Sequence, residues 1–352
     1  MGWSRIIGHE EVIERFRRSL KRERLSHAYL FVGPEGIGKE FFARELAKAL
    51  LCAQGSGEAC DRCPSCAKVE HGNHPDVTFV RRIEGSAKGG RKAQILIDQV
   101  REEIQDPIAY KPFEGRYKVF VVAEADRMTE EAQNCLLKTL EEPPPCSLLI
   151  LAASRLEPFV DTVVSRCQIV RFRRLTDAQA ERILRDGHGI EEGRARVLAR
   201  LAEGSPGRAL LYHAEGAFEA ATWLLAELAA IVPGAEFAVA AQLLDKVRET
   251  GSTLEDARER LRPILDLLAL AWRDLFFRAS GYGQDLLTWG AECEALGAIG
   301  AELPAAVAQR LIGLTAEARD HLDANANIKL LLETLMIDTC ALLRGREPLA
   351  VR

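Results

Sequence analysis

The chain has 352 residues, a mass of 38.9 kDa and a formal net charge of −5 at pH 7. This length allows two or three domains with hydrophobic cores, and the 47% hydrophobic and 28% charged content is typical of globular proteins. No apolar run approaches the roughly 18 residues of a membrane span, and the N-terminus lacks the apolar core of a signal peptide. We therefore expect a cytoplasmic protein without a membrane partner. The net negative charge excludes a general electrostatic attraction to nucleic acid. Contact with DNA would therefore need a local group of basic residues or partner proteins.

Strands and helices alternate over about the first 170 residues. Predicted strands cover 28–32, 77–81, 119–122, 148–152 and 169–172, and predicted helices cover 10–21, 41–51 and 98–105. The Gly-rich segment 85–90 is predicted to be a flexible loop. Alternation of this kind predicts an α/β domain with a mainly parallel sheet covered by helices.

The first predicted strand leads into Gly33-Pro34-Glu35-Gly36-Ile37-Gly38-Lys39-Glu40, which has the spacing of a P-loop. In a P-loop, backbone N–H groups cradle phosphates, a Lys reaches the terminal phosphates, and a Ser or Thr hydroxyl binds magnesium. The matching residues are Gly33, Gly36, Gly38 and Lys39. Glu40 stands where the hydroxyl is needed. The spacing indicates P-loop ancestry and leaves open whether nucleotide still binds or the loop is a tight turn that binds nothing.

A second strand ends in Val121-Val122-Ala123-Glu124, where a nucleotide hydrolase has an Asp followed by a Glu. Ala123 cannot bind a metal ion. Glu124 could polarise a water molecule only if a metal ion and a phosphate were present. Asp126 is nearby but displaced in register. Because two magnesium ligands are missing, we expect no ATP hydrolysis by this chain alone.

Four of the nine cysteines form a Cys-x7-Cys-x2-Cys-x2-Cys pattern directly after the P-loop helix. They are Cys52, Cys60, Cys63 and Cys66. In a reducing compartment this spacing predicts a closed tetrahedral metal site, with Zn²⁺ bound structurally and no open position for catalysis. The alternative is four unligated thiols in a Gly-rich loop.

Beyond Leu175 the pattern becomes helical. Short segments over 177–211 are interrupted by glycines, and the clearest later helices cover 261–277 and 305–322. We therefore predict three domains. They are an α/β P-loop domain over 1–174 with a zinc-binding insertion at about 52–66, a small helical domain over 175–215 and a larger helical domain over 216–352.

Several motifs together resemble one family. Asn134–Pro144, the tripeptide Ser165-Arg166-Cys167, the cysteine knuckle and Asn325–Glu333 look like those of bacterial DNA polymerase III clamp-loader subunits, which are AAA+ proteins. The resemblance runs from about residue 6 to residue 343. It implies that the small helical domain is a lid and that the larger one is a collar through which subunits assemble.

The degraded magnesium site makes the chain similar to the delta-prime type of subunit, not to the ATP-hydrolysing gamma/tau type. Active members carry a nucleotide-sensing Arg at a position where Gly204-Ser205-Pro206-Gly207-Arg208 has Gly207, with Arg208 one residue late. Ala153-Ser154 stands where active subunits usually have two threonines. With Glu40 and Ala123, these make four departures around one site.

The resemblance implies a stator inside the polymerase III holoenzyme, in a five-subunit ring with gamma/tau and delta types. Such a ring opens the sliding clamp and places it on primer-template DNA, so this chain would reach both through the complex. The resemblance also implies that Arg166 is an arginine finger acting in trans on ATP bound to a neighbouring subunit. The tripeptide alone favours a simpler interpretation, in which Arg166 is a surface residue before a strand.

Two other functions remain open. One is an active gamma/tau-like ATPase, in which Glu124 would work with an unconventional metal arrangement. The other is a zinc-containing DNA-binding adaptor. A basic stretch near the N-terminus could touch phosphates, but on a helix its side chains spread around the circumference, which favours a solvated face. The stretch consists of Arg15, Arg17, Arg18, Lys21, Arg22 and Arg24.

Overall fold

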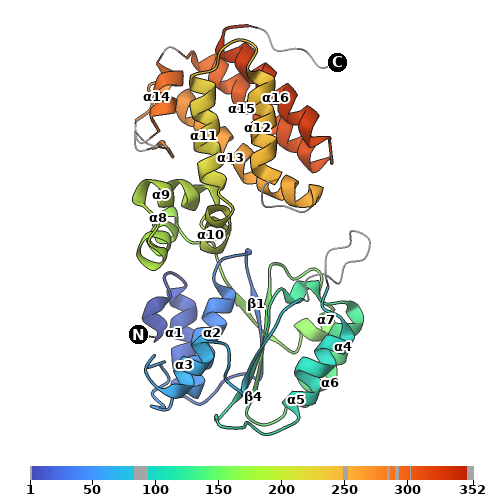
Figure 1. Ribbon diagram of the computed structural model, residues 1–352. Coiled ribbons are helices and arrows are strands. Elements are labelled where there is room, and N and C mark those ends of the chain that lie inside the picture. The colour runs from blue at the N-terminus through green and yellow to red at the C-terminus, as the bar shows by residue number, and fades with distance from the viewer. Residues whose placement is uncertain are drawn as a thin grey trace. The chain divides into compact units, whose positions relative to one another are not determined.

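The computed structural model describes residues 2–82, 94–248, 253–283, 286–289, 293–301 and 303–346. The chain folds into two compact units, Met1–Leu175 and Thr176–Arg352. In Figure 1 the first unit is coloured blue to green and the second continues to red. The loop predicted at 85–90 lies outside the described residues.

The N-terminal unit is built on a sheet of five parallel strands in the order β2-β3-β4-β1-β5. The strands are β1 (Ala28–Val32), β2 (Val77–Val80), β3 (Lys118–Val122), β4 (Ser147–Ala153) and β5 (Gln168–Arg171). The structure confirms the five strands predicted from the sequence. In this order the carboxyl ends of β1, β3 and β4 lie beside one another at one edge, where ligands bind in sheets of this type.

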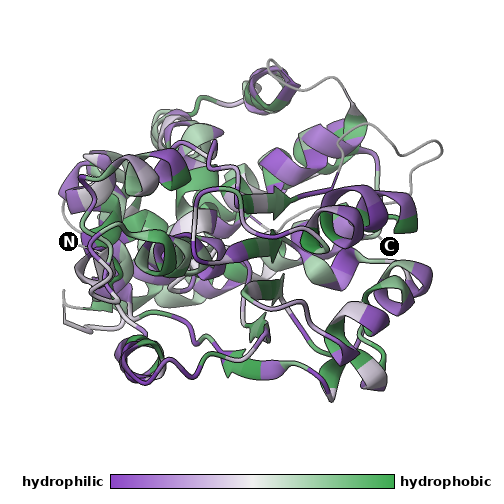
Figure 2. Ribbon diagram, turned by 90° about the horizontal axis from the view of Figure 1, so that it is seen from below, coloured by the Kyte–Doolittle hydropathy of each residue, from purple (hydrophilic) through white to green (hydrophobic). Residues whose placement is uncertain are grey.

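Both faces of the sheet are covered, which explains why β1 and β4 are buried at every position instead of alternating between buried and exposed residues. On one face Leu30 and Val32 join a hydrophobic cluster with Leu136 of α6. On the other face Phe31 packs against Phe42 of α2, with ring centroids 5.7 Å apart. The colouring in Figure 2 shows the strands as largely hydrophobic and the surrounding helices as mixed.

The helices of this unit lie in two layers, with α1, α2 and α3 on one face of the sheet and α4, α5 and α6 on the other (Figure 1). The helical segments are η1 (Gly2–Arg5), α1 (Glu10–Lys21), α2 (Lys39–Leu51), α3 (Pro64–Glu70), α4 (Ile97–Val100), η2 (Arg101–Gln105), α5 (Asp106–Ile108), η3 (Ala125–Arg127), α6 (Glu130–Glu141) and α7 (Asp161–Val164). The helix predicted at 98–105 is part of the longer run α4–η2–α5. Helix α2 begins two residues earlier than predicted because Gly38 is already its N-cap.

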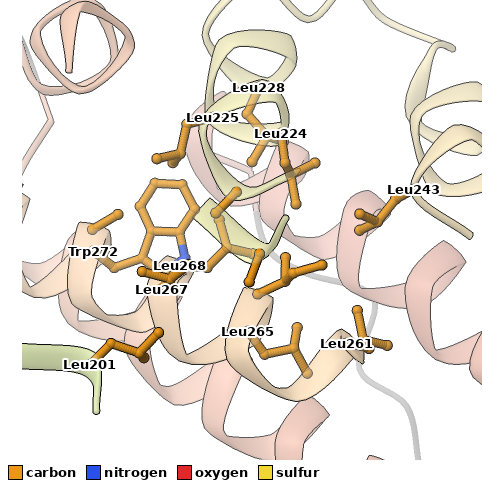
Figure 3. Packing of buried hydrophobic residues seen from close by; sticks show 14 of the residues in the cluster. Leu201, Leu224, Leu225, Leu228, Leu243, Leu261, Leu265, Leu267, Leu268 and Trp272 are labelled. Carbon is orange, nitrogen blue, oxygen red and sulfur yellow. The ribbon is translucent and has the colours of Figure 1, made fainter. Parts of the chain in front are cut away.

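The C-terminal unit is helical, as predicted. Its segments are α8 (Asp177–Arg182), η4 (Ile183–Gly187), α9 (Glu192–Leu201), α10 (Pro206–Ala214), α11 (Ala217–Ala229), α12 (Glu236–Arg248), α13 (Leu254–Ala279), α14 (Glu294–Gly300), α15 (Ala305–Asp323) and α16 (Ile328–Leu343). One hydrophobic cluster extends from Ala180 to Leu342. Figure 3 shows part of it, where leucines of α11 face Trp272 of α13. The division of this unit into a lid and a collar stays a prediction. Among the described helices, none is both long and apolar enough to span a membrane.

Candidate functional site

The P-loop of the sequence is a tight connection between β1 and α2, and its glycines have a steric explanation. Gly36 and Gly38 have φ angles of 71° and 96°, which residues with a side chain rarely adopt. A Cβ atom on Gly33 would lie 2.3 Å from the carbonyl oxygen of Phe172, so only glycine fits there. The loop is therefore a tight turn whose backbone requires glycine at these three positions.

Lys39 is turned back onto the loop. Its Nζ donates hydrogen bonds to the carbonyl oxygens of Gly33 at 2.6 Å and Pro34 at 2.7 Å, and the residue is only 9% exposed. Burial lowers the pKa of this amine from its ordinary value, against the opposing effect of Asp126 and other carboxylates. A phosphate would have to replace two short hydrogen bonds within the chain before it could use the lysine.

The two glutamates at the predicted magnesium site are bound by arginines that the sequence analysis did not single out. Glu40 Oε2 lies 2.9 Å from Nη2 of Arg81, and Glu124 Oε2 lies 2.9 Å from Nε of Arg82. Both arginines directly follow β2, which pairs with β3, so they emerge at the same edge of the sheet as the P-loop. Their position at the end of a predicted strand was the only signal in the sequence. Both carboxylates are thus neutralised from within the chain.

The remaining donor atoms do not fit a P-loop magnesium site. Ala123 is 3% exposed and offers no side-chain ligand. Of the nearby carboxylates, Asp126 has a buried Oδ1 without a hydrogen-bond partner among the described groups. A single carboxylate beside two ion-paired glutamates lacks the hydroxyl and the aspartate that normally hold the metal.

Arg208 is the arginine nearest in sequence to the position expected for a nucleotide-sensing arginine, and its side chain already has a partner within the chain. Arg208, in α10, donates from Nη2 to the hydroxyl of Tyr212 at 2.6 Å and from Nε at 3.2 Å. Its guanidinium lies 5.6 Å from the centre of the same ring. Arg208 is therefore held by a residue one turn along its own helix.

The four cysteines of the predicted metal site come together in space. The sulfur atoms of Cys52, Cys60, Cys63 and Cys66 all lie within 4.8 Å of one another. Four thiolates around Zn²⁺ at about 2.3 Å would be about 3.8 Å apart, so the cluster needs only a small contraction. Hence this group can hold a metal ion.

Burial and hydrogen bonds to the backbone change the pKa values of these thiols. Cys63 caps the N-terminus of α3, and its sulfur accepts a hydrogen bond from the N–H of Cys66 at 3.4 Å. Burial acts to raise the pKa of Cys63, but backbone N–H groups of Ala53 and Cys66 outweigh it and lower the pKa to about 6. Burial raises the pKa of Cys66 to about 12, so a bound metal ion would have to displace that proton.

A buried lysine attaches the cysteine knuckle to α2. Lys48 is 1% exposed, and its Nζ lies 2.9 Å from Glu45, 2.5 Å from Asp61 and 2.9 Å from Glu70. Arg5 completes the network at 3.0 Å from both Glu45 and Glu70. Asp61 lies between two of the cysteines in sequence, so the network connects the knuckle to the helix that follows the P-loop. No local pattern in the sequence predicted this network.

Arg166 lies between α7 and β5 with its side chain 35% exposed. Its Nη2 is 2.7 Å from Glu141 Oε1, at the end of α6. Its Nη1 donates to the carbonyl oxygen of Thr162 at 3.0 Å and to Ser165 Oγ at 3.4 Å. The guanidinium is therefore accessible and held in place on two sides.

Comparisons with known proteins return DNA polymerase III subunits. Residues 8–176 match the family described as "DNA polymerase III, delta subunit". DNA polymerase III subunit delta' of Bacillus subtilis is 36% identical over 190 residues, which cover 54% of this chain and 55% of the relative. Subunit tau of Escherichia coli is 36% identical over 206 residues, which cover 57% of this chain and 30% of the relative. The aligned regions thus span about half or less of these relatives.

Among solved structures, a DNA polymerase III gamma subunit-related protein from Thermotoga maritima is 17% identical, with a TM-score of 0.48, and the match covers 95% of this chain and 99% of that one. The family match falls on the unit that carries the altered P-loop, the cysteine knuckle and Arg166. Over residues 8–176 the chain is therefore similar to bacterial DNA polymerase III clamp-loader subunits.

Proposed function

We propose that this chain is a delta-prime-like stator of the clamp loader, which helps place the sliding clamp on primed DNA in the cytoplasm without hydrolysing ATP itself. The observation that carries the proposal is the state of the P-loop. Lys39 donates to the carbonyl groups of the loop, and Glu40 and Glu124 are paired with arginines. In an ATPase, the lysine would bind phosphate and the residues at the other two positions would serve the magnesium ion. Here all three side chains bind groups of the same chain instead.

Its partners would be gamma/tau-type and delta-type subunits in a five-membered ring, with the sliding clamp and primer-template DNA reached through the complex. In such a ring Arg166 would complete the ATP site of a neighbour by stabilising charge that develops on the γ-phosphate. Its ion pair with Glu141 is solvent-exposed, and such pairs are worth about 0–1 kcal/mol. A triphosphate on a neighbouring subunit could therefore attract the guanidinium at little cost.

We further propose that the cysteine cluster binds Zn²⁺. Four thiols match the preference of zinc for sulfur, and they would leave no coordination position open. The role would be structural: zinc would tie the end of α2 at Cys52 to the start of α3 at Cys63.

Reconstitution of the clamp loader tests the role of Arg166. With Arg166→Ala, ATP turnover at the neighbouring site should fall by about 10³- to 10⁵-fold, as for other arginine fingers, so only turnover at the remaining sites persists. Subunit assembly, measured by size-exclusion chromatography, should be unchanged. Arg155→Ala is the matched control, because Arg155 is exposed and lies in the loop after β4. If the Arg166→Ala variant shows normal DNA-dependent ATP turnover and normal clamp loading, Arg166 is not an arginine finger.

The second candidate function is an active gamma/tau-like motor, favoured by the similarity to tau subunits. Calorimetric titration of the purified chain with ATP, with and without magnesium, separates the two. The stator predicts no binding, or weak binding that does not depend on magnesium, and no turnover. Tight magnesium-dependent binding with turnover would make this chain a motor.

A further inference from the structure

Among the described residues of the N-terminal unit, the most exposed large hydrophobic side chains lie on one short segment, residues 109–117, between α5 and β3. We call this segment the aromatic turn. Phe113 is 85% exposed and Tyr110 is 72% exposed. Rings of this size are normally buried, and exposing them costs favourable hydrophobic free energy. Two such rings within four residues indicate a binding function.

The aromatic turn is held rigidly by a buried carboxylate. Asp76 is 1% exposed, and it accepts hydrogen bonds from the N–H groups of Phe113 at 2.5 Å, Glu114 at 2.9 Å and Gly115 at 2.7 Å. Gly115 is tightly packed in this turn, since a Cβ atom there would lie 2.5 Å from a methyl group of Leu51 and 3.2 Å from Asp76 Oδ2. The exposed position of Phe113 is therefore fixed by structure, which lowers the entropic cost of binding.

The charge around the two rings is positive. Lys111 and Arg116 are exposed and form no ion pair with any described residue. Glu114 is the one acidic residue between 109 and 117, and Lys68 neutralises it at 2.7 Å. Arg116 and Lys68 also line a surface hollow of about 320 Å³ beside the cysteine knuckle. On a chain with a net charge of −5, this is a local basic site.

We propose that the aromatic turn binds single-stranded nucleic acid, with Phe113 and Tyr110 stacking on bases and Lys111 and Arg116 binding phosphates. Proteins that bind single strands combine aromatic platforms with cationic groups in this way. Only unpaired bases offer free faces for stacking, which selects single strands over duplex.

The observations favour nucleic acid over an apolar protein groove. Phe113 and Tyr110 make no ring–ring contact with any described residue, so no other ring of the described chain covers their faces. Two unpaired cations accompany the rings, and an apolar groove would bury them at a cost. The site goes beyond the proposed stator function, since it concerns the isolated chain and does not involve Arg166 or the P-loop.

The test is fluorescence anisotropy of a labelled oligothymidylate of about 20 nucleotides, titrated with the full chain at low salt. Phe113→Ala and Tyr110→Ala should each weaken binding by about 5- to 100-fold, the range for loss of one stacked base. Lys111→Ala should also reduce the dependence of log affinity on log salt by about 0.7.

Two control variants make the result specific. Phe237→Ala removes another exposed ring, 57% exposed on α12, and Arg24→Ala removes a charge from the N-terminal basic stretch. Neither should change oligonucleotide affinity. The proposal is wrong if the chain binds no oligonucleotide at low salt, or if Phe113→Ala binds as tightly as the wild type. It is also wrong if Phe113→Ala weakens association with another clamp-loader protein and leaves oligonucleotide affinity unchanged, since the turn would then dock protein.

Discussion

Replacing Lys48 by methionine should strongly destabilise the N-terminal unit, although Lys48 lies outside both the P-loop and the cysteine cluster. The change keeps most of the side-chain volume and removes one positive charge. Lys48 is 1% exposed and contacts three carboxylates, of which Glu45 is fully buried. Burial already raises the pKa of Glu45 above its ordinary value despite this pairing, so its charged form depends on Lys48.

The structure sets the size of the effect. Removal of one partner from a buried ion pair costs about 3–5 kcal/mol, because the other charge is left without compensation. Arg5 lies 3.0 Å from Glu45 and from Glu70 and would still neutralise part of that charge. Asp61 would keep the hydrogen bond from the N–H of Gly2 at 2.9 Å. We therefore expect a loss of about 3 kcal/mol in the free energy of unfolding, at the lower end of that range.

Urea unfolding, followed by circular dichroism with saturating zinc, measures this loss. Lys68→Met is the matched control, because its ion pair with Glu114 is more than one-third exposed on both sides and should contribute about 0–1 kcal/mol. Adding Glu45→Gln to Lys48→Met should restore part of the stability, since the uncompensated buried charge is then gone. If Lys48→Met unfolds within about 1 kcal/mol of the wild type, the buried network does not hold the knuckle as we infer.

Two further predictions concern the cysteine knuckle and its surroundings. Elemental analysis should find about one zinc ion per chain, which Cys60→Ser with Cys63→Ser should abolish and Cys146→Ser, outside the cluster, should retain. Zinc retained by the double variant would refute the site. The hydrogen bond from Arg5 is the main cause that lowers the pKa of Glu70 from 4.5 to about 2. This carboxylate should therefore stabilise the fold above about pH 4.5, and the contribution should fade as the pH drops towards 2. The difference in unfolding free energy between wild type and Glu70→Gln should shrink over that window; a constant difference would contradict the assignment.

Local patterns in the sequence were sufficient to predict the strands and the altered P-loop. The run Ala28–Val32 is apolar at every position because both faces of its strand are covered, and Gly36 and Gly38 are required by positive φ angles. The spacing of the four cysteines likewise predicted their proximity, since two short turns suffice to bring the sulfurs together. These features depend on neighbours within a few residues, or on burial alone.

Contacts between residues far apart in the chain could not be predicted in this way. Arg81 binds Glu40 across 41 positions because β2 and the P-loop end at one edge of the sheet. The contact of Arg166 with Glu141 depends in the same way on where α6 ends relative to α7. A side chain shows its charge in the sequence, but its partner is decided by how the strands and helices pack.

The sequence by itself determined the class of this protein: a P-loop scaffold without magnesium ligands, a cysteine knuckle, and motifs shared with clamp-loader subunits. The tertiary structure decided what the charged groups do. It turned Lys39 onto its own loop, buried Lys48 among carboxylates and left the rings of the aromatic turn exposed. The physical reason is that burial and ion pairing depend on distances across the fold, which no local pattern encodes.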